Sequence, residues 1–193
     1  FLKFRTSWFD MFRVNLGERY LTFKAALNLL YQRETHNIVE TGCLRQVGDW
    51  GGGQSTFLFG QFLERHGGSL VTIDISEKNM AVAKEVTKPY NDYITYVVED
   101  SVSALMKMHN KIDMAYLDSM DCPIEGDATV PQEHNLNEFI TIEKCLYPGS
   151  IILLDDNDFS NGGKTLKTCE YMWESGKYVN VLNYQQSLWV VKG

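Results

Sequence analysis

Ile38-Val-Glu-Thr-Gly-Cys-Leu-Arg45 and, a few residues later, Gly51-Gly-Gly-Gln-Ser-Thr56 decide the fold. The first segment is a short apolar run that ends in an acid, Glu40, and a glycine, Gly42. The second is a glycine-rich loop that leads into a helix beginning near Ser55. In α/β proteins such a strand, turn and helix start present unpaired backbone N–H groups to a nucleotide-like ligand. A carboxylate at this place favours a ligand with a cationic or hydroxyl-rich end over a phosphate.

Length and charge limit the class of protein. The chain has 193 residues, enough for one domain with a full core, and its net charge is −7, from 18 basic and 25 acidic residues. Phosphate contacts need clustered Lys and Arg, so we expect neither nucleic acid nor an anionic membrane as a partner. No apolar run approaches the roughly 20 residues of a membrane span. The four cysteines include no C-x-x-C pair, which favours reduced thiols in a cytoplasmic protein over a zinc site or disulfides.

Strand and helix patterns alternate along the chain, which is typical of a parallel sheet covered on both faces. An N-terminal helical segment, residues 1–36, contains a helix expected over Leu16–Gln32, and a Rossmann-like core covers residues 37–193. The expected strands of the core are Asn37–Thr41, Ser69–Ile75, Ile94–Val98, Ile112–Leu117 and Ser150–Leu154. The expected helices begin near Ser55 and at Ser76, and cover Ser101–Met108, Gln132–Leu146 and Lys164–Ser175.

The end of the chain contains two further strand patterns, Tyr178–Leu182 and Ser187–Val191. They are joined so closely that they can pair only as an antiparallel hairpin. We therefore expect an α/β fold in a single domain: a Rossmann-like, doubly wound, mostly parallel sheet of about seven strands with a C-terminal antiparallel hairpin. This ending, together with Glu40 and Gly42, resembles the class I S-adenosylmethionine-dependent methyltransferases over nearly the whole chain. Within them the chain resembles the small-molecule O-methyltransferases, including the metal-dependent catechol type.

The resemblance implies S-adenosylmethionine as the cofactor. It implies that Glu40 and Gly42 hold the amino-acid end, where a carboxylate suits a cationic ammonium and sulfonium. Ser55, at the start of the following helix, is expected beside them. Asp74 ends the second strand, about 20 positions after Gly53, which is the spacing of a ribose-binding acid. That spacing alone does not separate S-adenosylmethionine from NAD.

Two further parts of the cofactor site follow from the resemblance. It implies that Asp100 reads the adenine amino group and that Ser101 contacts the ring. Asp100 is also suited to cap the helix that starts at Ser101. The insertion Cys43–Trp50 separates Gly42 from the later glycines. Trp50 is expected either to cover the cofactor as part of a lid or to be a half-buried residue of a surface loop.

Acids also follow the fourth and fifth strands. Asp118 follows one, and Asp156 and Asn157 follow the other; oxygen ligands of this kind suit Mg²⁺ or another divalent cation. The resemblance to metal-dependent O-methyltransferases implies that these three residues bind such a cation, which would position and acidify an acceptor hydroxyl. Acids that only cap helices or form turns are the alternative. Those enzymes also carry a Lys three residues after the first metal-binding Asp, where this chain has Asp121.

His134 is the best candidate for another catalytic base, beside Asp118, because its residue type suits proton transfer near neutral pH. A locally hydrogen-bonded residue near a helix start is the alternative. The expected function is O-methylation of a small hydroxylated substrate, such as a sugar or natural product. An NAD-dependent oxidoreductase is weakened by the missing G-x-G-x-x-G and by the hairpin. A non-catalytic partner domain of Rossmann-like fold also stays open, because Asp121 replaces the lysine.

Overall fold

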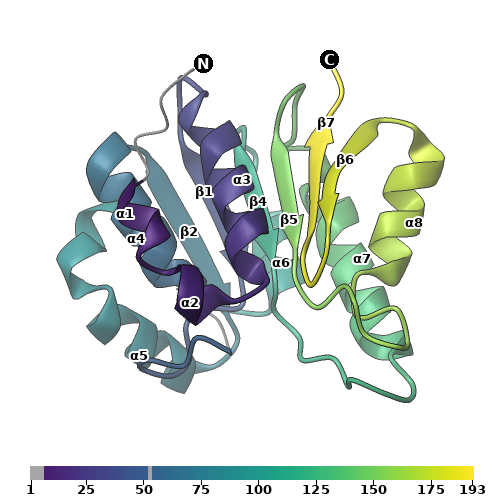
Figure 1. Ribbon diagram of the computed structural model, residues 1–193, viewed down its shortest axis with the longest axis horizontal. Coiled ribbons are helices and arrows are strands. Elements are labelled where there is room, and N and C mark those ends of the chain that lie inside the picture. The colour runs from purple at the N-terminus through teal and green to yellow at the C-terminus, as the bar shows by residue number, and fades with distance from the viewer. Residues whose placement is uncertain (1–6, 52–53) are drawn as a thin grey trace.

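The fold is described from a computed structural model, which covers residues 7–51 and 54–193. Helices and strands alternate from the first strand onward, as predicted (Figure 1). The strands are β1 Asn37–Thr41, β2 Ser69–Asp74, β3 Ile94–Val98, β4 Met114–Leu117, β5 Ile151–Leu154, β6 Tyr178–Asn183 and β7 Ser187–Val191. The helices are α1 Ser7–Asp10, α2 Arg13–Leu16, α3 Arg19–Tyr31, α4 Ser55–His66, α5 Glu77–Val86, α6 Ser101–Met106, α7 Thr129–Glu143 and α8 Leu166–Ser175, and a 3-10 helix covers Lys88–Tyr93.

The seven strands form one sheet in the order β3-β2-β1-β4-β5-β7-β6. The strands β1 to β5 are parallel to one another, whereas β7 is antiparallel to both β5 and β6. The predicted fold, a doubly wound and mostly parallel sheet with a C-terminal antiparallel hairpin, is confirmed. The strand order reverses between β1 and β4, and open α/β sheets bind their ligands at the carboxyl ends of the strands beside such a point.

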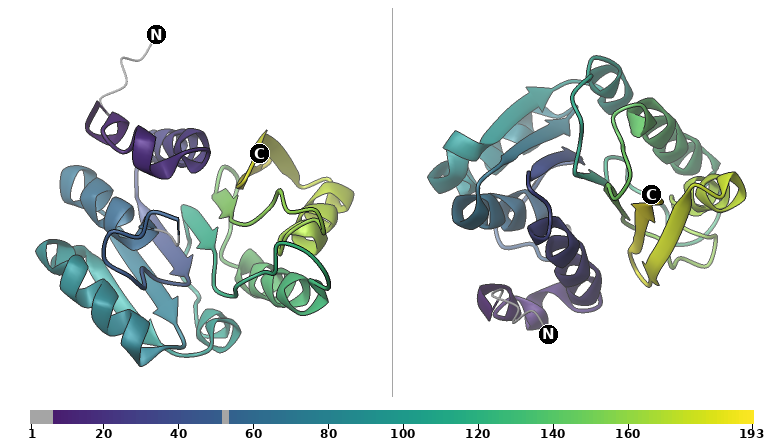
Figure 2. Two further views of the ribbon diagram at one scale, coloured as in Figure 1. Left: turned by 60° about the horizontal axis from the view of Figure 1, so that its bottom comes forward. Right: turned by 90° about the horizontal axis from the view of Figure 1, so that it is seen from above.

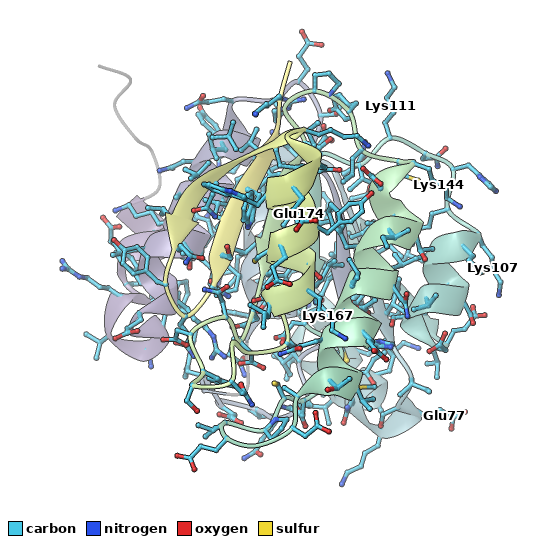
Figure 3. All side chains as sticks on the ribbon, turned by 90° about the vertical axis from the view of Figure 1, so that its right-hand side faces the viewer. Glu77, Lys107, Lys111, Lys144, Lys167 and Glu174 are labelled. Atoms are coloured by element: carbon cyan, nitrogen blue, oxygen red, sulfur yellow. The ribbon has the colours of Figure 1, made fainter. Side chains whose placement is uncertain are left out.

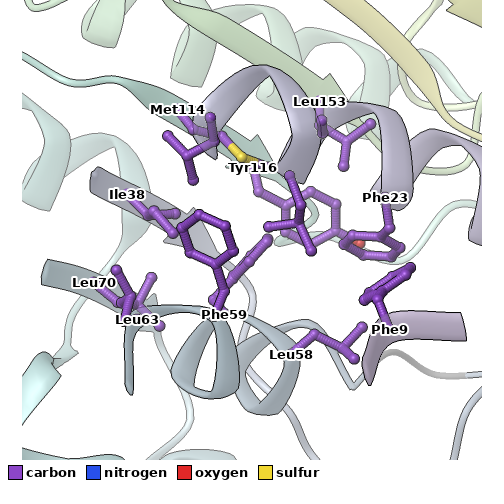
Figure 4. Close-up of a cluster of buried hydrophobic side chains, with 14 of the residues drawn as sticks. Phe9, Phe23, Ile38, Leu58, Phe59, Leu63, Leu70, Met114, Tyr116 and Leu153 are labelled. Atoms are coloured by element: carbon purple, nitrogen blue, oxygen red, sulfur yellow. The ribbon is translucent and has the colours of Figure 1, made fainter. Parts of the chain in front are cut away.

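Helices cover both faces of the sheet (Figure 2). On one face α3 and α4 pack on the central strands, and their Phe23 and Phe59 contact the ring of Tyr116 in β4 (Figure 4). On the other face α7 and α8 bury Phe139 and Met172 against β4 and β5. Burying apolar side chains on both faces explains why the inner strands read as continuous apolar runs rather than alternating ones.

The helix predicted over Leu16–Gln32 is α3, which begins three residues later than predicted, at Arg19. The backbone turns at Gly17, with φ of 55° and ψ of −126°, so α2 ends at Leu16 and α3 begins at Arg19. Glycine adopts this conformation without the steric cost that a side chain would add. The apolar residues that predict this helix all lie within α3, so the prediction was wrong in where the helix starts.

Two other helices begin away from their predicted starts. α7 begins at Thr129 rather than Gln132 because Pro131 fits into a first turn, where backbone N–H groups have no partner within the helix. α8 begins at Leu166 rather than Lys164, since the preceding glycines hold the chain in a loop. Lys164 therefore belongs to the loop after β5 and points into the molecule, with only 2% of its side chain exposed.

The loops that follow the parallel strands meet at one edge of the sheet, the lower edge in Figure 1. The long connection from β4 to α7 runs along this edge, beside the loop that leads from β5 to α8. Of the helices that the structure describes, none has the length and apolar character needed to cross a membrane.

Candidate active site

Two adjoining cavities of about 300 and 200 Å³ lie at the carboxyl ends of the parallel strands. They share Gly42, Asp74, Ile75, Ser119 and Asp121, and we call them together the strand-end cleft. The larger cavity is also lined by Asp100, Ser101, Met120 and His134, and the smaller one by Cys43, Arg45, Ser55, Ser76, Asn79 and Asp118. Most of the predicted cofactor residues therefore lie around one space.

Asp74 ends β2 and lines both cavities. Its Oδ1 accepts a hydrogen bond from the backbone N–H of Ser76 at 2.7 Å, and its Oδ2 accepts one from the N–H of Cys43 at 3.2 Å. The carboxylate thus joins the loops after β1 and β2 and also stands at the start of α5. Its contact with the start of α5 is compatible with its place in the cleft.

Asp100 and Ser101 lie on the far side of the larger cavity, at the start of α6. Asp100 caps this helix by accepting the N–H of Ser103 at 2.9 Å, and this bond lowers the pKa of Asp100 below its ordinary value. The Ser101 hydroxyl lies 3.1 Å from Nε2 of His134, and that same nitrogen lies 3.0 Å from the hydroxyl of Ser119. His134 is therefore beside the residues predicted to contact adenine.

Glu138 is the other neighbour of His134. It is fully buried, and its Oε1 lies 3.5 Å from Nε2 of His134. The interaction with Glu138 raises the pKa of His134 above its ordinary value, although burial opposes this shift. Ser101, Ser119 and Glu138 all contact the same ring nitrogen, Nε2 of His134. In a catalytic triad the histidine uses both ring nitrogens, so this arrangement is not a triad.

Glu40 is fully buried at the end of β1 and lines neither cavity. Its Oε2 accepts hydrogen bonds from the hydroxyls of Thr56 at 2.8 Å and Thr72 at 2.6 Å, while its Oε1 has no hydrogen-bond partner. Burial raises the pKa of Glu40 to about 7. Ser55, a buried residue of the cleft lining, interacts with the Glu40 carboxylate and partly offsets this shift of its pKa.

Gly42 follows Glu40 and lies where the loops after β1 and β4 pass closest. Its φ is +78°, and a Cβ atom there would lie 2.2 Å from the backbone oxygen of Asp118. A side chain at this position would push the two loops apart. The glycine is thus required for close approach of two backbones, in addition to lining the cleft.

The Cys43–Trp50 loop is held on two sides. The N–H of Leu44 donates to the hydroxyl of Thr56 at 2.9 Å, and Trp50 is half-buried, stacked on Phe12 with ring centroids 5.2 Å apart. Trp50 lines neither cavity, so it takes the second of its two predicted places, that of a half-buried loop residue.

Three acids and two cations form a cluster that adjoins the cleft at Asp118. The ammonium of Lys164 binds Oδ1 of Asp118 and lies 3.1 Å from Oδ2 of Asp156, while Nε of Arg19 lies 3.0 Å from Oδ1 of Asp155. One negative charge remains in excess. Burial, together with Asp155 and Asp156, raises the pKa of Asp118 to about 7, although Lys164 opposes this shift. Burial would lower the pKa of Lys164, but the acids outweigh it and hold that pKa above its ordinary value.

Tyr116 connects this cluster to the apolar core. Its ring is fully buried between Phe23 and Phe59, and its hydroxyl donates to Oδ2 of Asp155 at 2.6 Å and lies 3.1 Å from Oδ2 of Asp118. Burial and the adjacent carboxylates raise the pKa of Tyr116 well above its ordinary value, so it stays a hydrogen-bond donor. Packing of the Tyr116 ring in the core therefore fixes the hydroxyl that contacts the cluster.

The predicted metal ligands do not form a metal site. Asp118 and Asp156 are brought together, but Lys164 occupies the space between them. Oδ1 of Asn157, the third predicted ligand, instead accepts the hydroxyl of Thr165 at 2.9 Å. Across residues 7–51 and 54–193, no three His, Cys, Asp or Glu side chains are grouped as a metal ion would require. These residues do not fit a divalent cation as they stand.

Sequence reasoning missed the two cations of the site. Arg19 and Asp155 are 136 positions apart, and Lys164 and Asp118 are 46 apart. The signal that could have indicated Lys164 is its place directly after Gly162-Gly163 in the loop that follows the acids of β5. Asp121 stands where the metal-dependent enzymes carry a lysine, and the lysine that contacts Asp118 in this chain comes from a different loop.

Comparison with known proteins gives a family. A model described as "Methyltransferase domain" matches residues 49–157, which is more than half of the chain. The match ends before Lys164. The search of curated proteins finds no match.

Solved structures share the fold at low sequence identity. A SAH-bound methyltransferase from Podospora anserina aligns with a TM-score of 0.66 and 15% identity over 96% of this chain and 85% of its own. An O-methyltransferase from Bacillus cereus in complex with SAH has a TM-score of 0.59 and 18% identity over 99% of this chain and 93% of its own. A 16S rRNA methyltransferase from T. thermophilus has a TM-score of 0.61 and 15% identity over 91% of this chain and 43% of its own. Structures that share this fold thus include both an O-methyltransferase and an rRNA methyltransferase.

Proposed function

Since the chain belongs to the methyltransferase-domain family and is a class I S-adenosylmethionine-dependent methyltransferase, we propose that it O-methylates a small hydroxylated molecule in the strand-end cleft. The observation that carries this proposal is the placement of Asp74, Asp100 and Asp118. They follow three parallel strands, β2, β3 and β4, and line one connected space. Three separate carboxylates around one cleft suit a ligand with a hydroxyl-rich middle and cationic groups.

The charge of the cleft supports this cofactor over a dinucleotide. Its lining includes the acids Asp74, Asp100, Asp118 and Asp121 and one permanent cation, Arg45. That cation is itself paired with Asp121 at 2.8 Å. A sulfonium and an ammonium are attracted by this excess of negative charge, whereas the pyrophosphate of NAD would be repelled.

We assign the parts of the cofactor as follows. Asp74 accepts the ribose hydroxyls, since a carboxylate can accept from two donors at once. Asp100 and Ser101 bind the adenine end, and Gly42 and Ser55 the amino-acid end. Glu40 supports that end through Ser55, and its Oε1 lacks a hydrogen-bond partner.

The acceptor oxygen must lie in line with the methyl group that S-adenosylmethionine supplies. As the new oxygen–carbon bond forms, the carbon–sulfur bond breaks and its electrons stay on the sulfur. The hydroxyl proton then needs a base. Asp118 lines the smaller cavity and is our first candidate for it, and His134 is the second because it lines the larger one. The divalent cation is not part of this proposal, because Lys164 stands between its predicted ligands.

A small acceptor agrees with the charge of the chain. The net charge of −7 disfavours an RNA backbone, which is bound through clustered cations. An RNA acceptor is nevertheless the outcome to compare against, since the structural neighbours include an rRNA methyltransferase.

Methyl transfer can be measured directly. The full chain is incubated with methyl-labelled S-adenosylmethionine and, separately, with polyhydroxylated small molecules, catechols and total RNA. We expect label in the small-molecule fraction, with loss in Asp118→Asn and a lowered kcat in His134→Gln if His134 is the base. Label in RNA alone would overturn the assigned acceptor class. A His134→Gln change that alters only KM for S-adenosylmethionine would place His134 in cofactor binding.

A further inference from the structure

The loop from Asp156 to Lys164 folds back on itself, so that the lysine at its end lies beside the acid at its start. The backbone N–H of Lys164 donates to the backbone oxygen of Asp156 at 3.1 Å. Gly163 makes this closure possible: its φ is +64°, and a Cβ atom there would lie 1.8 Å from the same Asp156 oxygen. The hydroxyl of Thr165, the next residue, is held by Asn157. The backbone hydrogen bonds and glycine conformation of its own loop thus fix the position of Lys164.

The ammonium of Lys164 is completely satisfied by oxygen atoms. Nζ binds Oδ1 of Asp118, lies 3.1 Å from Oδ2 of Asp156 and donates to the backbone oxygen of Met120 at 3.1 Å. An ammonium has three N–H donors, and three oxygens from two different loops receive them. No N–H donor of the ammonium is left for a substrate, so Lys164 acts as an internal cation and does not bind substrate directly.

Carboxylate and carbonyl oxygens converging on one point are also what a hard divalent cation selects. Here that point is the Nζ atom of a lysine with only 2% of its side chain exposed. We propose that Lys164 is the built-in replacement for the divalent cation of this site, and that it holds Asp118 in place so that the transferase works without metal. This deepens the proposed function and rests on it for the reaction, although the identity of the cation can be tested without turnover.

Lys164 is a positioning residue in this account. It lines neither cavity but contacts two residues that do, the carboxylate of Asp118 and the backbone oxygen of Met120, and the hydroxyl of Tyr116 lies 3.1 Å from Asp118. With Lys164 on one carboxylate oxygen and Tyr116 near the other, the carboxyl plane is fixed from two sides. A divalent cation could do the same holding, but would also offer open positions to the acceptor, which a saturated ammonium does not.

Mn²⁺ binding, followed by electron paramagnetic resonance, tests the replacement. We expect the wild-type chain to leave the spectrum of free Mn²⁺ unchanged. Lys164→Ala removes the ammonium and should take up about one Mn²⁺ per chain, because two acids and a carbonyl oxygen then face a space that needs a cation. The double variant Lys164→Ala with Asp118→Asn should lose that uptake. The matched control is Lys167→Ala, which removes a partly exposed lysine of α8 that is paired with Glu133 of α7 (Figure 3) and should create no site.

The wild-type measurements keep the proposal falsifiable even if Lys164→Ala fails to fold. One tightly held Mn²⁺ on the wild-type chain, or activity lost on chelation and restored by Mg²⁺, would overturn it. A folded Lys164→Ala that takes up no Mn²⁺ would overturn it as well. SAH binding by the same wild-type sample is scored separately, so that a failure of the proposed function is told apart from a failure of the lysine assignment.

Discussion

At the scale of single residues, the account depends on where three carboxylates point. Asp74, Asp100 and Asp118 were identifiable from the sequence because each lies at or just after the end of a strand, and parallel strands end at one edge. Their local partners were also predictable, since Asp100 caps α6 and Asp74 serves the turn into α5. What sequence could not indicate is Lys164, because its contact with Asp118 depends on how two distant loops fold.

Substitution of Asp74 tests the cofactor site at this scale. Asp74→Asn keeps the size of the side chain but weakens its two-fold acceptance of ribose hydroxyls, so we expect about a tenfold or greater loss of SAH affinity. The thermal shift at a fixed SAH concentration reports it.

Asp113 provides the matched control for that substitution. It is a buried acid that accepts the backbone N–H of Asn37 at 2.7 Å, at the opposite end of the strands. Asp113→Asn should lower stability without altering SAH affinity. Equal losses of affinity in Asp74→Asn and Asp113→Asn would mean that Asp74 acts only through the fold.

Glu40 gives a pH dependence with a defined sign. Its pKa is raised by burial to about 7 in the folded chain, against an ordinary value of 4.5, so the folded state holds more protons between these pH values. The free energy of unfolding therefore falls as pH rises through that window, by up to about 3 kcal/mol. Glu40→Gln does not titrate and should remove this fall, so its stability relative to wild type rises from pH 5 to pH 8.

Chemical denaturation at several pH values measures this difference. Glu85→Gln on α5 is the control, because Glu85 is exposed. A Glu40→Gln chain whose unfolding free energy follows wild type at every pH would show that the buried acid does not carry the effect.

At the scale of elements, the strands and most helices follow from apolar patterning, but the turns that break or delay helices do not. Gly17 separates α2 from α3 and delays the predicted helix to Arg19, whose side chain then reaches Asp155. Gly163 delays α8 and leaves Lys164 in the site loop. In both cases a glycine moves the start of the helix by two or three residues, and apolar spacing alone does not indicate such a shift.

Two glycines with nearly the same φ angle allow the role of the site loop to be tested separately from backbone strain. Gly163 and Gly176 have φ values of 64° and 66°, but a Cβ atom at Gly176 meets nothing within 4 Å. Gly176→Ala should therefore cost about 1 kcal/mol, the usual penalty of a positive φ. Gly163→Ala should cost at least about 2 kcal/mol more, since it adds the clash with Asp156.

Urea denaturation and a transfer assay on the two variants separate strain from function. Gly163→Ala should also lose activity, because displacement of the loop moves Lys164 away from Asp118. Gly176→Ala should keep it. If the two variants unfold at the same urea concentration with the same activity, the loop is not held as described.

At the scale of the whole molecule, the alternating pattern and the closing hairpin were sufficient to predict the sheet, and the strand order confirms it. The fold places the loops after β1 to β5 at one edge, and the excess of acids there distinguishes this cleft from one built for phosphates. The metal was the part of the prediction that the fold did not support, because an internal lysine neutralises the acids that patterning assigned to it.

The most direct test is a calorimetric titration of the full wild-type chain with SAH in chelator-treated buffer. The account predicts binding of about one SAH per chain, with an affinity that added Mg²⁺ does not change. Absence of binding, or binding that appears only after Mg²⁺ is restored, would contradict it.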